Sequence, residues 1–241
     1  MNTEIWSFQD CPDVKYAKAI FDFLLPEYER IFGTDVMNHE VCCIYNDPAS
    51  TSPMLQYGKP LRIRTNLSSL GFWCKEIFQL SHEMCHYAIR QKKQNKEFVL
   101  SWFEEVLCES MSLYALHYAA AHWNQCALYS INPNYNTSIS AYLNNECKSP
   151  ATDGLEECAS LEKLSEYERQ KLSESHRESH VNERNAVFSA ILRHPEEARC
   201  FLDYEKYVCS QNGLTLDFDK WYHDDPCDMV KTLRSIQPIL L

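Results

Sequence analysis

Most of the chain shows apolar residues at helical spacing. The stretch VKYAKAIFDFLLPEYERIFG, residues 14–33, predicts an amphipathic helix that is bent or broken at Pro26 and closed by Gly33. The same spacing predicts helices at about 70–92 and about 98–123, the second of which contains neither glycine nor proline. Long helices are therefore expected to dominate the first half of the chain.

A period of two residues occurs in two short stretches only. EVCCIYND, residues 40–47, and KPLRIRTNL, residues 59–67, are predicted to be strands. The segment between them is rich in serine, threonine and proline and is expected to be an exposed loop. The second strand alternates between two faces, with Leu61, Ile63 and Thr65 on one face and Arg62 and Arg64 on the other.

The second half of the chain is again helical in pattern. A short helix is predicted at about 137–146, and KSPATDG, residues 148–154, is the best candidate for a linker. Residues 155–209 are charged and helical in pattern, and 214–240 are expected to add one more helix.

These elements predict an α+β fold that is mainly helical, with a short β-sheet. Only 5 glycines in 241 residues agree with a high helical content. The expected organisation is a core at 1–147 and a C-terminal helical subdomain at 155–241 that packs on it, or one single domain.

Charge and composition exclude several classes of partner. The net charge of −11 argues against nucleic-acid binding, which requires clustered lysine and arginine, and the densest basic run, RQKKQNK at 90–96, is interpreted as a solvated helix end. No apolar stretch reaches the roughly 18 residues of a membrane span, and no signal peptide is visible. The expected location is cytoplasmic, with a secreted chain lacking its signal as the alternative. Five of the 12 cysteines lie beside apolar residues in helical patterns and are expected to be buried free thiols: Cys74, Cys85, Cys108, Cys126 and Cys200.

Candidate chemistry is concentrated in QLSHEMCHYAIRQ, residues 79–91. His82 and His86 are four residues apart, so on a helix both imidazoles project from one face and can reach one metal ion. Glu83 lies beside that face, where it can reach a metal-bound water without binding the metal. This is the HExxH arrangement, which predicts two metal ligands and a general base.

A third ligand is expected on the next helix. Glu105, in SWFEEVLCES, follows His86 by 19 positions. Two helices joined by a short turn at about 93–97 can pack antiparallel and bring this carboxylate over the histidine pair. Glu104 is the competing ligand, but it points about 100° away on a helix and is expected to be a neighbour at the rim.

The ligand spacing resembles that of the gluzincin metallopeptidases, in which HExxH is followed by a glutamate ligand after about 18 residues. WFEEVLCE also resembles the aminopeptidase-like version of this pattern, with Trp102 as its aromatic residue and Glu109 as its later acid. The resemblance covers roughly residues 60–115. It implies a zincin-like fold with two packed active-site helices, Zn2+ as the cofactor and a peptide or protein as the substrate.

The chain also departs from the family pattern. Glu104 stands where the family has asparagine, and Val106 replaces a small glycine. A segment similar to GxMEN, which anchors the substrate N-terminus in the aminopeptidases, is missing from the sequence. The resemblance therefore supports a minimal gluzincin and gives no support to aminopeptidase activity.

The resemblance also implies roles for residues beyond the ligands. Glu109 would accept a hydrogen bond from a ligand histidine and fix its tautomer. The strand before the HExxH helix would be an edge strand that binds an extended peptide, through Arg62, Ile63, Arg64 and Thr65. A tyrosine or histidine would stabilise the oxyanion, and the candidates are His176, His180, Tyr167, Tyr204 and Tyr207. For the two histidines of HRESH, however, a solvated helix face is the favoured interpretation.

The leading hypothesis is thus a zinc metallopeptidase in which His82, His86 and Glu105 bind the ion and Glu83 is the general base. One alternative is a zinc-binding regulatory or interaction protein without peptidase activity. Another is a latent peptidase whose C-terminal helices block the cleft. The sequence does not determine the substrate, the cleavage specificity or the oligomeric state.

Overall fold

The fold is that of a computed structural model. The structure describes residues 5–9, 14–69, 71–94, 99–148, 158, 160–171 and 180–237. For residues 170 and 171 it describes the backbone and not the side chains.

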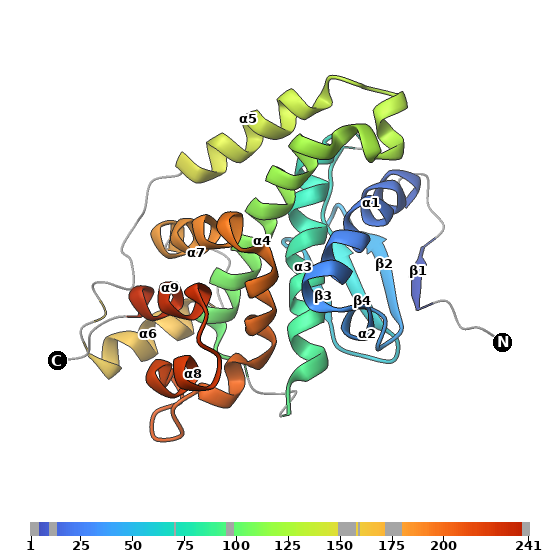
Figure 1. The fold of residues 1–241 in the computed structure, drawn as a ribbon. Coiled ribbons are helices and arrows are strands. Elements are labelled where there is room, and N and C mark those ends of the chain that lie inside the picture. Colours follow the sequence, from blue (N-terminus) through green and yellow to red (C-terminus); the bar gives the residue numbers. More distant parts are fainter. Residues whose placement is uncertain are drawn as a thin grey trace.

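A small mixed β-sheet forms one side of the molecule (Figure 1). Its strand order is β1-β2-β4-β3; β1, β2 and β4 run parallel, and β3 is antiparallel to β4. The expected strands at 40–47 and 59–67 are confirmed as β2 and β4, whereas β1 and β3 were not predicted, because three residues are too few to show a period. The strands are β1 Trp6–Phe8, β2 Cys42–Asn46, β3 Met54–Gln56 and β4 Leu61–Thr65.

The position of β4 corrects one prediction. β4 is hydrogen-bonded on both sides, to β2 and to β3, so it is an internal strand. The edge on this side is β3, in the segment that was expected to be a loop. The alternation predicted for β4 is confirmed, since its aliphatic and threonine side chains are buried and Arg62 is exposed.

The first helix, α1 (Val14–Phe32), is continuous through Pro26, so the helix is not broken there. Proline is tolerated because it lies on the exposed face, where water can satisfy the carbonyl that loses its partner, while Leu24 and Tyr28 bury the opposite face. Gly33 ends the helix as predicted, with a φ of 100° that favours glycine.

Helices α3 (Trp73–Lys92) and α4 (Ser101–His122) form the centre of the molecule. Helix α3 contacts α1, β3 and β4 on one side and α4 on the other (Figure 1). The two predicted helices and their close packing are therefore confirmed. The remaining elements of the first half are α2 Thr34–Met37, the 3-10 helices η1 Trp123–Gln125 and η2 Ala127–Ser130, and α5 Tyr135–Lys148.

The C-terminal half covers the side of α4 away from the sheet (Figure 1). It consists of α6 Leu161–Lys171, α7 Val181–Arg193, the 3-10 helix η5 Pro195–Tyr207, α8 Phe218–Asp224 and α9 Asp228–Ile236. The segment 214–240 was expected to be one helix, but it contains two, because Pro226 lies between α8 and α9.

The two halves share one hydrophobic core. Phe103 of α4 lies 5.4 Å from the ring of Tyr204 and 6.2 Å from that of Trp221. All three side chains are fully buried in the same apolar cluster as the strands and α1. The described part of the C-terminal half is therefore built into the core, and most of the predicted linker lies outside the described residues.

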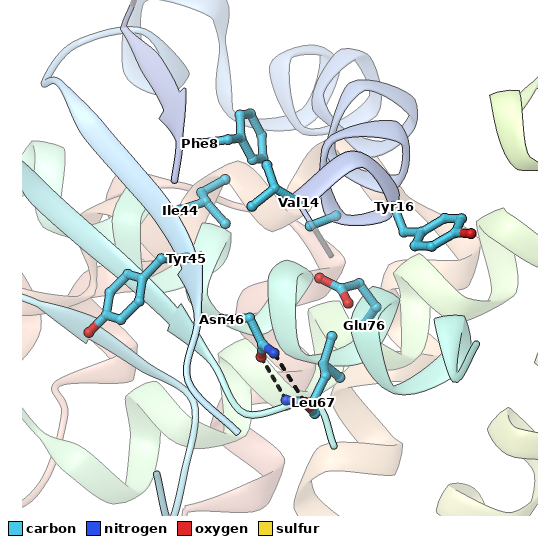
Figure 2. Close-up of a pocket in the computed structure, with 9 residues that line it drawn as sticks. Phe8, Val14, Tyr16, Ile44, Tyr45, Asn46, Leu67 and Glu76 are labelled. Atoms are coloured by element: carbon cyan, nitrogen blue, oxygen red, sulfur yellow. Dashed lines mark hydrogen bonds between the residues drawn. The ribbon is translucent and has the colours of Figure 1, made fainter. Parts of the chain in front are cut away.

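The end of β2 is tied to the segment that leads into α3. Asn46 donates from its amide to the carbonyl of Leu67 at 3.1 Å and accepts from the backbone N–H of Leu67 at 2.8 Å, as Figure 2 shows. Beside this link lies a hollow of about 10 Å³ near Glu76 and Ile44. Such a volume holds about one water molecule, so this hollow is a packing defect.

Two further expectations concern the thiols and membranes. The five cysteines expected to be buried are buried, with free thiols. Among the described residues, the helices are too short or too polar to span a bilayer.

Candidate metal centre

Helix α3 brings the two histidines of HExxH together. His82 and His86 are separated by one helical turn, and their Nε2 atoms lie 3.1 Å apart. The pair lies on the side of α3 that faces α4. Both nitrogens are oriented toward the same point, as expected for two ligands of one ion.

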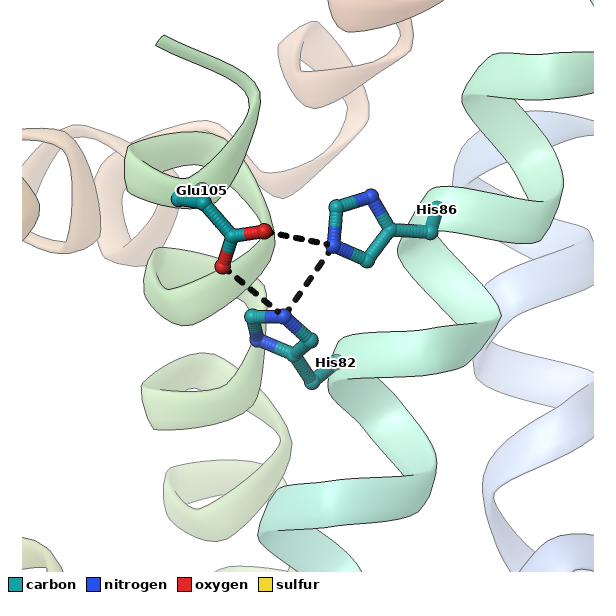
Figure 3. Close-up of side chains that lie close together, drawn as sticks. All are labelled: His82, His86 and Glu105. Atoms are coloured by element: carbon teal, nitrogen blue, oxygen red, sulfur yellow. Dashed lines mark hydrogen bonds and ion pairs between the residues drawn. The ribbon is translucent and has the colours of Figure 1, made fainter. Parts of the chain in front are cut away.

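Glu105 of α4 completes the cluster from the opposite helix (Figure 3). Its Oε2 lies 3.2 Å from Nε2 of His82, and its Oε1 lies 3.3 Å from Nε2 of His86. The side chain is 31% exposed, so one side of the cluster remains open to solvent. The predicted convergence of α3 and α4 thus places His82, His86 and Glu105 where they could hold a metal ion.

The distances match the geometry of a tetrahedral ion. A zinc ion with bonds of about 2.0–2.1 Å separates its ligand atoms by about 3.3–3.4 Å. Here the two histidine nitrogens lie 3.1 Å apart, and each lies 3.2 or 3.3 Å from a different oxygen of Glu105, so the carboxylate spans the pair. Two imidazole nitrogens and a carboxylate that face one another form a donor set that fits a divalent cation.

The titratable groups of the cluster stabilise one another as ion pairs. Burial opposes a charge on His86, but the carboxylates of Glu104 and Glu105 outweigh this effect and raise the pKa of His86 well above its usual range. Burial likewise opposes a charge on Glu105, but His82 and His86 lower the pKa of that carboxyl well below its usual range. The cluster is thus organised to keep a carboxylate next to a positive charge.

Glu83 lies in the cleft beside the cluster. It is buried, and it lines the same cleft as His82 and His86. The structure thus places the predicted general base beside the ligands.

Glu104 is not at the rim, as the sequence predicted, but is buried behind His86. Its Oε1 accepts a hydrogen bond from Nδ1 of His86 at 2.8 Å, and the residue is 2% exposed. Burial would raise the pKa of Glu104, but His86 and Lys93 outweigh burial and lower it to about 2. Glu104 therefore bonds to a candidate ligand histidine, the kind of contact that the resemblance assigned to Glu109.

Glu109 lies one turn after Glu105 and also lines the cleft. Its Oε2 accepts from Nη1 of Arg184 at 3.2 Å, and both residues are buried. Arg184 also donates to the carbonyl of Glu146 at 2.7 Å. This ion pair joins α4 to α7, and a hydrogen bond that Glu109 accepts from a candidate ligand histidine stays a prediction.

The cluster opens into a cleft of about 790 Å³, a size typical of ligand sites. Strand β3 and Tyr57 form one wall, and Arg62 of β4 also contributes. Ile63 and Thr65 are buried in the interior, so their side chains do not contact a ligand in the cleft. Arg64 donates to the carbonyl of Ser52 at 3.1 Å. Of the four predicted substrate-binding residues, Arg62 is thus the one that lines the cleft.

The structure places the candidates for oxyanion stabilisation in different surroundings. His180 lines the cleft and is 1% exposed, so it does not lie on a solvated face, as the sequence had favoured. Its Nδ1 is hydrogen-bonded to the hydroxyl of Tyr167, and its Nε2 has no partner among the described residues. The hydroxyl of Tyr204 is bonded to Glu104, and the ring of Tyr207 stacks on Trp221. His176 lies outside the described residues.

A side pocket of about 300 Å³ adjoins the cleft at His82 and Glu109. Its walls combine apolar side chains, among them Phe78 and Tyr142, with polar and charged ones, among them Lys75 and Arg184. The pocket can therefore hold one side chain of a ligand that lies in the cleft.

Several residues of this centre were missed by the sequence. Lys93 was assigned to a solvated helix end, yet it is buried and contacts Glu104. Its distance of 11 residues from Glu104 gives no periodic signal. Arg184 was not singled out, and Tyr204 was considered only as an oxyanion stabiliser; they lie 75 and 100 residues from their partners Glu109 and Glu104. One sequence signal could have indicated the role of Glu104, namely that it is adjacent to Glu105. Adjacent residues point to different faces of a helix, so one acid can face the ion while the other bonds to a ligand histidine.

Comparisons of this chain with protein-family models, with curated proteins and with solved structures find no match.

Proposed function

We propose that this protein is a zinc-dependent metallopeptidase of the gluzincin type. The observation that carries the proposal is the convergence of His82, His86 and Glu105, with separations that fit one tetrahedral ion, beside Glu83 in an open cleft. A purely structural zinc site has four protein ligands and no need of a base. Three ligands and a neighbouring carboxylate favour a site that activates water.

A metal ion held by these three residues would supply a Lewis acid and lower the pKa of a bound water. Glu83 takes a proton from the attacking water as the water oxygen bonds to the scissile carbonyl carbon. The same carboxyl then gives this proton to the leaving nitrogen as the C–N bond breaks. The burial of Glu83 limits its contact with bulk water, which favours transfer within the site.

The substrate would bind as an extended chain along β3. One side of β3 pairs with β4, and among the described strands none pairs with its other side. Backbone groups of Met54–Gln56 at the wall of the cleft can therefore pair with a peptide by strand addition. The side pocket beside His82 would receive a substrate side chain next to the scissile bond.

His180 is the proposed stabiliser of the oxyanion. Its Nδ1 is hydrogen-bonded to Tyr167, which fixes the ring, and its Nε2 has no partner among the described residues. An imidazole held in this way at the cleft can donate to an oxygen that becomes negative during the reaction.

The test compares wild-type protein with Glu83→Gln. Metal content is measured by elemental analysis, and hydrolysis is measured on a mixed peptide library with chelator, without chelator and after the metal is added back. We expect Glu83→Gln to retain metal and lose hydrolysis, and Glu162→Gln, at an exposed position on α6, to behave as wild type.

Hydrolysis by Glu83→Gln at the wild-type rate would remove Glu83 from its role. A wild-type protein that binds metal but cleaves no peptide would support the alternative of a non-catalytic metal-binding protein. A wild-type protein without metal would refute the proposal.

A further inference from the structure

Glu104 bonds to the second ring nitrogen of His86, a candidate metal ligand, and its own surroundings are unusual. Its Oε2 accepts from Nζ of Lys93 at 2.5 Å and from the hydroxyl of Tyr204 at 2.6 Å. We call Lys93, Glu104 and Tyr204 the Glu104 cluster. Its three members come from the end of α3, from α4 and from η5, which are distant in sequence.

The Glu104 cluster is closed off from solvent. Lys93 is 6% exposed and Glu104 2%, while Tyr204 is fully buried. A lysine is rarely buried unless a charge partner compensates it, and here the ammonium group and the carboxylate balance each other. A surface ion pair would move with its side chains, whereas this pair is fixed by the packing around it.

The geometry restricts the carboxylate of Glu104. Two donors hold Oε2, so the group cannot rotate about its last bond without breaking both contacts. Oε1 is therefore fixed toward His86 and accepts from Nδ1 at 2.8 Å. A proton held on Nδ1 leaves the lone pair of Nε2 free, and Nε2 is the atom that faces Glu105 at 3.3 Å.

We propose that Lys93 and Tyr204 are positioning residues that act through Glu104 to hold His86 in the orientation and tautomer that bind the metal. This inference rests on the proposed metal site. It goes further because it makes metal affinity depend on η5, in the C-terminal half, through one tyrosine hydroxyl. Partners of this kind contribute about 10- to 100-fold to metal affinity.

The first test compares two tyrosines of η5. Tyr204→Phe removes the hydroxyl that bonds to Glu104, and Tyr207→Phe removes a hydroxyl from a ring that stacks on Trp221. The Kd for Zn²⁺ is measured by competition with a chromophoric chelator, and the Co²⁺ form is recorded by visible absorption. We expect Tyr204→Phe to bind Zn²⁺ about 10-fold more weakly, with an altered Co²⁺ spectrum, and Tyr207→Phe to bind as wild type.

The second test separates metal affinity from stability. Lys93→Met alone leaves an unpaired buried carboxylate and is expected to destabilise the protein, even to the point of unfolding. The double variant Lys93→Met/Glu104→Gln removes both charges and keeps the side-chain volumes similar. In the absence of metal, we expect the double variant to be about as stable as wild type. We still expect it to bind Zn²⁺ at least about 10-fold more weakly than wild type.

The outcomes are distinct for the two proposals. If wild type binds Zn²⁺ and both Tyr204→Phe and the double variant bind it equally well, the Glu104 cluster has no positioning role and the inference is overturned. If Tyr204→Phe and Tyr207→Phe weaken binding to the same extent, the effect is structural and the inference is also overturned. If wild type itself binds no metal, the proposed function fails first.

Discussion

The helix pair α3–α4 and the C-terminal half contribute to the centre in different ways. The pair α3–α4 supplies the three candidate ligands and Glu83 within a short stretch of sequence. The C-terminal half supplies none of these ligands, but it contributes His180 to the cleft wall, Arg184 to Glu109 and Tyr204 to Glu104. One region thus carries the candidate ligands and the proposed base, and the other contributes to their surroundings.

The C-terminal half is packed into the shared core and bonded to the candidate centre, which argues against a cover that can be removed. Tyr204 is both a core residue that packs on Phe103 and a hydrogen-bond donor to Glu104. Removing it would change the packing and the metal centre together. The latent-enzyme alternative requires the opposite, namely a catalytic core that is complete without these helices.

The strongest test of the comparison is a chain that ends at Lys148. It would expose Trp102 and Phe103, which are fully buried in the shared core. Because the loss of one large core side chain costs about 3–5 kcal/mol and several are removed here, we expect the truncated chain not to fold. Circular dichroism and thermal unfolding would check this. A folded truncated chain that cleaves peptides would contradict it and support latency.

The next largest effect is expected at a ligand. Glu105→Ala removes the carboxylate that bridges both histidine rings. We expect Zn²⁺ affinity to fall by more than about 100-fold and hydrolysis to be lost, since even residues outside the ligand set contribute about 10- to 100-fold. Elemental analysis after dialysis measures the change, with Glu166→Ala on α6 as the control. Retention of stoichiometric metal by Glu105→Ala would exclude this ligand.

A smaller effect, on the rate alone, is expected in the C-terminal half. His180→Gln should lower kcat by about 10²–10³-fold without loss of metal, because an oxyanion donor acts mainly in the transition state. Steady-state kinetics beside metal analysis measure this, and His194→Gln, half-exposed on the far end of α7, is the control. A change in KM with kcat unaffected would assign His180 to substrate binding instead.

The smallest effect is a pH dependence of the metal-free protein. The pKa of Glu104 is about 2 in the folded protein against an ordinary value of 4.5, so its contribution to stability is present above about pH 4.5 and is lost as the pH falls toward 2. The full loss is about 3 kcal/mol at most. Urea unfolding should show wild type losing stability relative to Lys93→Met/Glu104→Gln as the pH is lowered, and a constant difference between the two would contradict the assignment.

The sequence predicted the helices of the site well because their signal is local. The apolar spacing of α3 and α4 and the positions of His82, His86 and Glu105 depend on the period of one helix and a short turn. Strand β3 gave no such signal, since three residues in a polar segment show no alternation. β4 was therefore assigned to the edge that β3 occupies.

By itself, the sequence determined that two histidines share one helix face and that a carboxylate follows at a distance suited to an antiparallel neighbour. Only the tertiary structure decided that Glu104 points inward, that Lys93 is buried beside it and that Tyr204 closes the cluster from 100 residues away. The physical reason is that helical periodicity fixes directions within one element. The burial of a charge and its partner depends on which elements pack around it.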